Sequence, residues 1–296
     1  MKLLKLLSML LCILLPLPSA AQKAKTIDEL VEMFDASRCA ECHDVIYEQW
    51  EKSHHARPMM GTRGFLNMTL LAKAGATPFS PDDPKQATLK TYPCLKCHLP
   101  QAVEYAEDSV AVELTEAIIA QDKEKIAKLQ ITCIVCHNQK AIIHQLEEGK
   151  PDPGTLYGND ELDSHEDEVF EAVKKSAVMK RSLMCGQCHG LGPNLEFDNP
   201  VQCANLYGSY LHAYIPAGGS QTCQECHMKP INGLADHLMA PNFDDIPQTT
   251  KLLQEALSLD VQTLGYEWRE HRKTSIPKVV VNTKIASTAG HRIPDG

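Results

Sequence analysis

The chain has 296 residues, and its 29 lysines and arginines stand against 38 aspartates and glutamates, for a net charge of −9. This acidic balance argues against a nucleic-acid-binding protein, which carries a basic surface. Only 5% of the residues are aromatic, which is thin for a core of this size, so something other than side chains is expected to fill the interior.

The first 21 residues have the features of a secretory signal peptide. Lys2 and Lys5 precede the apolar run 6–15, and small residues follow it. The run is too short to span a membrane, although a retained anchor is the alternative. Cys12 lies in this leader and is expected to be lost with it. No later stretch approaches the roughly 20 apolar residues of a membrane span, so we expect an exported protein, periplasmic or extracellular, without a transmembrane segment.

Ten of the twelve cysteines fall into five copies of one pattern, C-x-x-C-H. The copies are Cys39, Cys42 and His43; Cys94, Cys97 and His98; Cys133, Cys136 and His137; Cys185, Cys188 and His189; and Cys223, Cys226 and His227.

This pattern is the attachment sequence of c-type haem. The two thiols lie on one helical turn and add to the two vinyl groups of the haem, and the next histidine is the proximal iron ligand. Zinc sites built from C-x-x-C pairs give no reason for a histidine at the same position in all five copies. The sequence therefore predicts five covalently attached haems c, whose flat apolar rings supply core that aromatic side chains usually provide.

The remaining cysteine, Cys203, has no partner in the mature chain. The simplest interpretation is a small buried apolar residue, and an intermolecular disulfide or a reactive thiol is the alternative.

The ligand on the other face of each iron decides between electron transfer and catalysis, because an open face permits substrate to bind. Eight histidines remain for five such distal positions: His54, His55, His144, His165, His212, His237, His271 and His291.

For four of these eight histidines, only the local sequence indicates whether they could bind iron. His144 lies two helical turns after His137 and could serve a neighbouring haem. His212 lies in an aromatic run, His165 near a predicted helix start where a surface role is the alternative, and His271 in a charged run typical of a surface.

The first motif is followed by Trp50, Ser53, His55 and Ala56 in the pattern W-x-x-S-x-H-A. C-x-x-C-H followed by this pattern resembles the opening of the multihaem cytochrome c-554 type family. The resemblance implies that His55, in preference to His54, is a distal ligand.

Two later segments carry a similar resemblance. The fifth motif continues as C-x-x-C-H-M-x-P, and in the family a distal histidine follows it, which implies a ligand role for His237. Residues 290–296 resemble the family's G-H-x-x-P-x-G element, which implies the same role for His291. In relatives this element leads into further strands.

Between the motifs the sequence predicts a mainly α-helical protein with extensive loops, a multihaem cytochrome c fold organised around covalent haems, and a short β element at the C-terminus. The predicted helices begin at a capping box of Thr26 and Glu29 and cover about 109–129, 164–177 and 248–272. Polar loops are predicted over 77–93 and 149–163.

The predicted haem domain covers residues 22–275, with a candidate internal boundary at 149–163. The last segment, 276–296, contains one predicted strand over 278–285. A single strand is not a stable sheet. We therefore expect either a chain that is clipped relative to its relatives or a strand and His291 that dock on another subunit by strand addition.

These features favour an electron-transfer protein with mostly bis-histidine haems in an anaerobic or nitrogen, sulfur or metal respiratory chain. Its expected partners are redox proteins, such as quinol-oxidising or terminal-reductase cytochromes. A multihaem reductase or oxidase of a small nitrogen or sulfur compound is the first alternative. The surplus of histidines and the lack of a C-x-x-C-K motif disfavour it. A subunit of an extracellular cytochrome filament is the second alternative.

Overall fold

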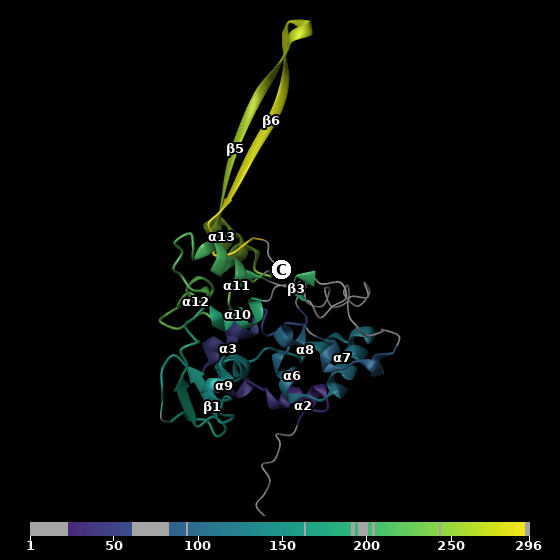
Figure 1. Cartoon of the computed structure of the whole chain (residues 1–296), viewed down its shortest axis with the longest axis vertical. Helices are drawn as coiled ribbons and strands as arrows, with labels where there is room; N and C mark the ends of the chain where they lie inside the picture. The colour runs from purple at the N-terminus through teal and green to yellow at the C-terminus, as the bar shows by residue number, and fades with distance from the viewer. Residues whose placement is uncertain are drawn as a thin grey trace, which may run out of the picture.

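The structure is a computed structural model that describes residues 23–60, 83–92, 94–162, 164–190, 193–194, 201–202, 205–242 and 244–293 (Figure 1). The predicted signal peptide, Cys203 and part of the predicted loop 77–93 lie outside the described residues. As predicted, the fold is mainly helical, with extensive loops and a β element near the C-terminus.

The apolar core lies in the N-terminal part of the chain. It is formed by α2 (Ile27–Met33), α6 (Pro100–Tyr105), α7 (Asp108–Ala120) and α8 (Lys123–Ala127). Among the described residues, every buried apolar side chain lies between Ala24 and Val178. The C-terminal third therefore has no side-chain core of its own in the described part.

The start of α2 follows the predicted capping box only in part. The Thr26 side chain accepts a hydrogen bond from the Glu29 amide, but the Glu29 carboxylate accepts from the Lys25 amide. The predicted helix over 109–129 divides in two, because Gln121 adopts a left-handed backbone conformation (φ 55°) at the end of α7 and Asp122 caps α8.

Each haem-attachment motif lies on or beside a short helix. These elements are η1 (Ser37–Glu41), α5 (Leu95–His98), the π-helical turn η4 (Val135–Gln139), α10 (Leu183–His189) and α12 (Cys223–His227). The other short helices are α3 (Asp44–Glu51), η2 (Pro84–Gln86), η3 (Leu89–Thr91), α9 (Gln145–Glu148), α11 (Leu206–Ser209) and η5 (Tyr210–Tyr214).

Two short strands replace a predicted helix. Strands β1 (Thr155–Gly158) and β2 (Ala172–Lys175) pair in parallel, so the helix predicted over 164–177 is wrong. The Asp167 carboxylate accepts hydrogen bonds from the amides of Val169 and Phe170. This local turn competes with helix formation, and the chain continues as a strand. A two-residue ladder, β3 (Pro193–Asn194) with β4 (Val201–Gln202), is antiparallel.

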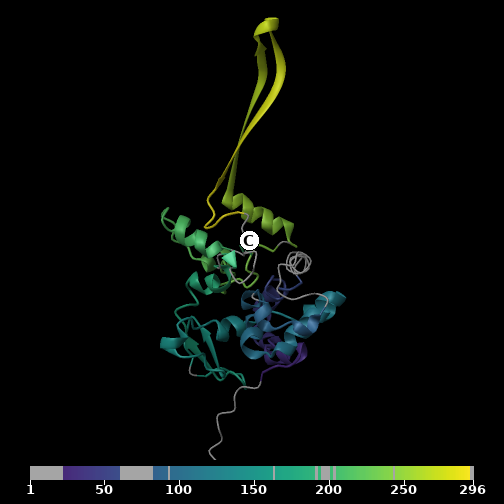
Figure 2. The same ribbon diagram turned by 45° about the vertical axis from the view of Figure 1, so that its right-hand side comes forward.

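A long β-hairpin projects from the molecule next to α13 (Ile246–Ala256). Its strands are β5 (Leu257–Arg269) and β6 (Thr274–Ser287), joined through η6 (Glu270–Arg272). In Figures 1 and 2 it extends away from the helical body as a two-stranded ribbon. The helix predicted to reach residue 272 is therefore wrong beyond Ala256. The predicted C-terminal strand exists, but it pairs within the chain with β5.

Burial in the core predicts which side chains contribute most to the free energy of unfolding. On α7, Leu114 is 1% exposed and Ile119 is 49% exposed. Leu114→Ala is expected to lower the free energy of unfolding by about 2–5 kcal/mol, because it leaves a cavity in the packed core. Ile119→Ala, the matched control, is expected to change it by less than about 1 kcal/mol. Denaturant unfolding of the haem-loaded variants measures both, and equal losses would contradict this assignment of the core.

Candidate haem sites

Four of the five proximal histidines face a second histidine ring. The centroid distances are 6.4 Å for His43 and His165, 6.1 Å for His189 and His55, 6.3 Å for His137 and His237, and 6.0 Å for His227 and His291. Three pairs are stacked with interplanar angles of 7°, 22° and 20°, and the rings of His189 and His55 are nearly perpendicular at 79°.

These distances fit an iron held between two imidazoles. A metal–imidazole bond is about 2.0–2.1 Å long, and a ring radius of about 1.1 Å at each end brings the centroids to roughly 6.3 Å apart. Direct stacking of imidazoles without a metal would bring the rings closer. The residues present therefore fit c-type haems bound by the proximal and distal histidines of one chain.

The structure separates the predicted distal histidines into two groups. His55, His165, His237 and His291 each face a proximal ring, as described above. His144 and His212 are exposed and belong to none of the histidine pairs in the described part of the chain.

The position of His212 follows from the geometry of its turn. Tyr210 stacks on Tyr207 at 6.0 Å and on Tyr214 at 5.6 Å between ring centroids. These three side chains share one side of the turn, and His212 is exposed. His144 is exposed at the start of α9, and His271, at the tip of the hairpin, is exposed as predicted.

Backbone carbonyls orient five of the facing rings. The Nδ1 atoms of His137, His165, His237 and His291 lie 2.8, 2.9, 2.8 and 2.8 Å from the carbonyl oxygens of Tyr157, Phe170, Ala235 and Arg292, and the Nδ1 of His227 contacts that of Ala240. A carbonyl can only accept, so each Nδ1 carries the proton and each Nε2 keeps its lone pair. This arrangement fixes both the tautomer and the direction of the ligand atom.

Burial keeps the ligand rings neutral. It lowers the pKa of His55 to about 4, with the nearby His189 as a second cause. Burial is also the main cause that lowers the pKa values of His98, His137, His189 and His227. A neutral imidazole offers the lone pair that a metal requires, so these positions are set for binding iron across the physiological pH range.

The segment that carries His55 is fixed by contacts with Ile131. The indole Nε1 of Trp50 donates to the Ile131 carbonyl at 2.9 Å, and the His55 carbonyl accepts from the Ile131 amide at 2.9 Å. The fully buried Ser53 hydroxyl accepts from the His55 amide at 3.2 Å. The tryptophan and serine of the W-x-x-S-x-H-A pattern thus fix the backbone of a ligand segment beside the third motif.

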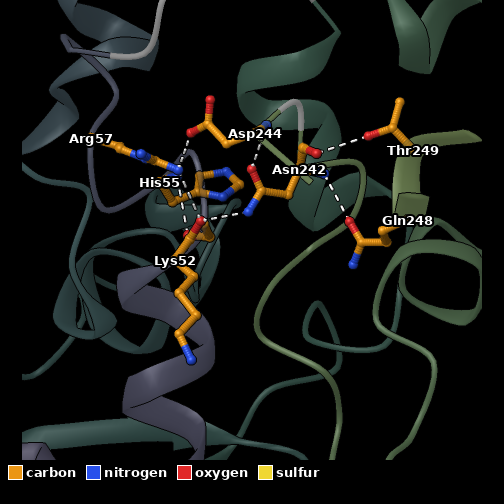
Figure 3. A network of polar contacts seen from close by, with 8 residues as sticks. Lys52, His55, Arg57, Asn242, Asp244, Gln248 and Thr249 are labelled. Carbon is orange, nitrogen blue, oxygen red and sulfur yellow. Dashed lines mark hydrogen bonds and ion pairs between the residues drawn. The ribbon is translucent and has the colours of Figure 1, made fainter. Parts of the chain in front are cut away.

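A polar network ties this segment to the loop before α13 (Figure 3). The buried Asn242 donates to the Lys52 carbonyl at 3.2 Å, and Arg57 pairs with Asp244 at 2.6 Å. Asn242 also accepts from Thr249 through its carbonyl at 2.8 Å and donates its amide to Gln248 at 3.0 Å. The network holds α13 against the chain on either side of His55.

The same loop positions two other rings of the histidine pairs. The His237 amide donates to the Gln49 side chain at 3.0 Å, and the Ala240 carbonyl accepts from His227. Residues 237–242 therefore connect parts of three histidine pairs. Sequence reasoning missed Gln49 and Asn242, because amides in a helix and a loop carry no pattern that marks them as anchors.

The base of the hairpin fixes His291. The Thr288 amide donates to the Ala256 carbonyl at 2.8 Å, and the Thr288 hydroxyl donates to the same oxygen at 3.2 Å. This clasp joins the end of α13 to the residues just after β6, three positions before His291. The expectation that His291 is used across a subunit interface is therefore unnecessary, since it faces His227 in the same chain.

The thiols of different motifs lie next to one another, and in the haem-loaded protein they stand for thioether sulfurs. Cys39 and Cys133 are hydrogen-bonding neighbours, as are Cys185 and Cys223, and Cys97 and Cys188. Cys136 interacts electrostatically with Cys188. The attachment points therefore form one connected chain, in the order motif one, three, four and five, with motif two beside motif four.

The second motif differs from the others. His98 is buried and hydrogen-bonds to the Pro58 backbone, and it lies near His55 and His189. Within the described residues it is the one proximal histidine that does not face a second histidine ring. The ligand on its far side is not defined by this part of the chain.

The attachment motifs, the facing histidines and the helical fold together define a multihaem c-type cytochrome. Residues 38–138, about a third of the chain, match the family described as cytochrome c554 and c-prime. The fold is similar to that of a penta-heme cytochrome c552 from Thermochromatium tepidum, with a TM-score of 0.55 and 21% identity over 90% of this chain and 68% of that chain. A search of curated proteins gave no match.

The chain thus resembles multihaem c-type cytochromes: residues 38–138 match the cytochrome c554 and c-prime family, the overall fold is similar to that of a penta-heme cytochrome, and both findings support haem c as the cofactor. Within the described residues, no helix is both long and apolar enough to cross a membrane.

The two tryptophans of the chain provide a matched test of the Ile131 contacts. Trp50→Phe removes the donor to the partly buried Ile131 carbonyl and is expected to lower the free energy of unfolding by about 1–3 kcal/mol. Trp268→Phe removes only a contact with Glu270 on an exposed side chain and is expected to change it by less than about 0.5 kcal/mol. The measurement is denaturant unfolding followed through the haem absorbance, and an equal effect of the two variants would refute the anchoring role of Trp50.

Proposed function

We propose that this protein is an exported pentahaem cytochrome that transfers electrons through closely spaced, mostly bis-histidine haems. The observation that carries the proposal is the set of four histidine pairs, each at the spacing of a six-coordinate iron. An iron with strong protein ligands on both faces has no position left for substrate, so it serves as an electron carrier.

Haem c supplies a metal centre that alternates between ferric and ferrous states. The histidines hold the ligand set unchanged between these states, because their rings are fixed by backbone carbonyls and by burial. Little structural rearrangement then accompanies each transfer. No general acid or base is needed for this function, and none is assigned.

The connected attachment points support a route through the chain. Since sulfurs of motifs one and three, two and four, and four and five are neighbours, each cofactor has at least one close neighbour in this arrangement. A single chain with this order can accept an electron at one end and deliver it at the other.

The leader of residues 1–21 supports export to the periplasm or beyond, and the composition supports redox proteins as partners. The net charge of −9, to which haem propionates add, favours encounter with basic surfaces of donor and acceptor cytochromes. A place in an anaerobic or nitrogen, sulfur or metal respiratory chain is the setting in which such a carrier is most useful.

One observation favours a second function. The undefined far side of His98 is compatible with a haem that binds a small molecule, and a reductase or oxidase of a nitrogen or sulfur compound would need such a site. The protein would then combine one reactive site with four carriers.

A redox titration distinguishes the two functions. The purified haem-loaded protein is expected to take up five electrons, one for each attachment motif, and to remain reduced when nitrite or hydroxylamine is added in the absence of oxygen. The measurement is the absorbance of the reduced haems against potential and then against time. Rapid, repeated oxidation by either compound would instead establish the enzymatic function, and uptake of fewer electrons would contradict the pentahaem proposal.

Histidine replacement tests the ligand assignment. His165→Ala is expected to convert one of the four low-spin ferric signals of the paired histidines to high-spin, because His43 loses its facing ring, and added imidazole is expected to restore it. His144→Ala, the control at an exposed histidine, is expected to leave the spectrum unchanged. Electron paramagnetic resonance of the oxidised proteins measures both, and a change in H144A but not in H165A would reverse the assignment.

A further inference from the structure

The hairpin of β5 and β6 has one apolar and one polar side. Cross-strand partners include Leu259 with Ile285, Val261 with Thr283 and Thr263 with Val281. Partners share a face, and alternate residues of a strand do so as well. Five exposed large side chains therefore lie on one side, called here the apolar face: Leu259, Val261, Val279, Val281 and Ile285.

The opposite side, called the polar face, carries charged and amide residues. Asp260 lies across from Lys284 and Gln262 across from Asn282. Past the irregularity between Leu264 and Tyr266, alternation along β5 places Glu267 and Arg269 on the same side as the apolar face, and Glu267 pairs there with Lys278 at 2.7 Å. From Leu257 to Leu264 the separation by face is that of a half-buried sheet.

Nothing in the described chain covers the apolar face. Its five side chains are between 50% and 76% exposed, and the ribbon stands clear of the helical body in both views (Figures 1 and 2). A two-stranded hairpin is at best marginally stable in water unless it packs against something. A contiguous exposed apolar surface of this kind marks an interaction site.

We propose that the apolar face packs against the same face of a second copy of this chain, with the two hairpins antiparallel about a two-fold axis near Val281. The proposal concerns assembly and is independent of the electron-transfer function. Two identical amphipathic ribbons are self-complementary, which is the requirement of an isologous interface.

The charge distribution favours this occupant and this orientation. The hairpin, residues 257–287, has five basic and three acidic residues, for a net charge of +2, and the remainder of the chain has 24 basic and 35 acidic, for −11. Antiparallel packing places each hairpin tip, with Arg272 and Lys273, towards the acidic body of the other copy. It also keeps the two acidic bodies apart.

The dimensions of the hairpin limit the area that two copies can bury between their apolar faces. Strands of 13 and 14 residues extend about 40 Å, and two strands are about 10 Å wide, so one face offers roughly 400 Å² and two stacked faces bury roughly 800 Å². A specific interface buries about 1,200 Å² or more. The remainder is supplied by each tip against the partner's body, beside α13.

The first test compares charge substitutions on the two faces in the haem-loaded full chain. The wild-type protein is expected to have the mass of a dimer in light scattering after size exclusion. Val261→Glu with Val281→Glu is expected to weaken association by roughly 100-fold or more, since four carboxylates would be buried in the dimer. The control, Gln262→Glu with Asn282→Glu, adds the same charge one residue away on the polar face and is expected to leave the dimer intact.

The second test fixes the orientation. Near the two-fold axis the residue 281 positions of two copies meet, so Val281→Cys is expected to form a disulfide-linked dimer under oxidising conditions, and Asn282→Cys is not. Haem content and Soret absorbance verify that each variant is folded.

Three results would overturn the proposal: a monomeric wild-type protein over a wide range of concentrations, equal effects of the two charge variants, or a dimer in which V281C does not cross-link. A monomer that binds anionic vesicles through the apolar face would assign that face to lipid, and open-ended polymers would assign it to a filament. In each case the five-electron uptake is unaffected, so failure here is distinct from failure of the proposed function.

Discussion

The central geometric feature of this fold is that pairs of imidazole rings face each other across about 6 Å, the space that one iron and its two bonds would require. The four pairs join histidines between 64 and 134 residues apart in sequence. Each pair therefore closes a long loop, as a cross-link does. Because the described part of the chain has no buried apolar side chain after Val178, the C-terminal third depends on these links and on the haem rings themselves. The low aromatic content has the same cause.

Loops can fix the orientation of the paired histidine rings here because a backbone carbonyl binds the Nδ1 atom of the ring. Five of the eight facing rings contact a carbonyl through Nδ1, and a carbonyl in a turn is as well placed as the turn itself. Side chains also connect these turns to helices. Asn242 donates to the Lys52 carbonyl at the end of α3, and the Gln49 side chain in α3 accepts from the His237 amide. A small number of side-chain contacts thus replaces the extended helix packing by which most proteins position a site.

The sequence predicts the proximal half of each site and little of the distal half. The spacing of cysteine and histidine in C-x-x-C-H is a local requirement of haem attachment, so it can be read without a fold. A distal histidine needs only to lie opposite a proximal one in the folded chain, so its neighbours in sequence need not follow any pattern. The sequence offers both His144 and His165 as candidates, and only tertiary structure separates the exposed ring from the one that faces His43. The predicted final helix is too long for a related reason. Leu257, Leu264 and Trp268 have helical spacing, whereas Leu257, Leu259 and Val261 alternate as in a strand, and pairing with the valine-rich β6 decides for the strand.

The base of the hairpin takes part both in the proposed assembly and in positioning a histidine of the haem sites. The clasp between Ala256 and Thr288 closes the base of the hairpin and also sets the start of the loop that carries His291. In the antiparallel dimer proposed above, the partner's tip lies beside this same base, close to α13. Contact with a second copy would then restrain the Ala256–Thr288 clasp, which precedes His291. In a hairpin without a partner, bending of the strands would displace this clasp. The end of the molecule with the least side-chain core is thus the end at which a second subunit adds the most order, and the His227 and His291 pair is the site that benefits from it.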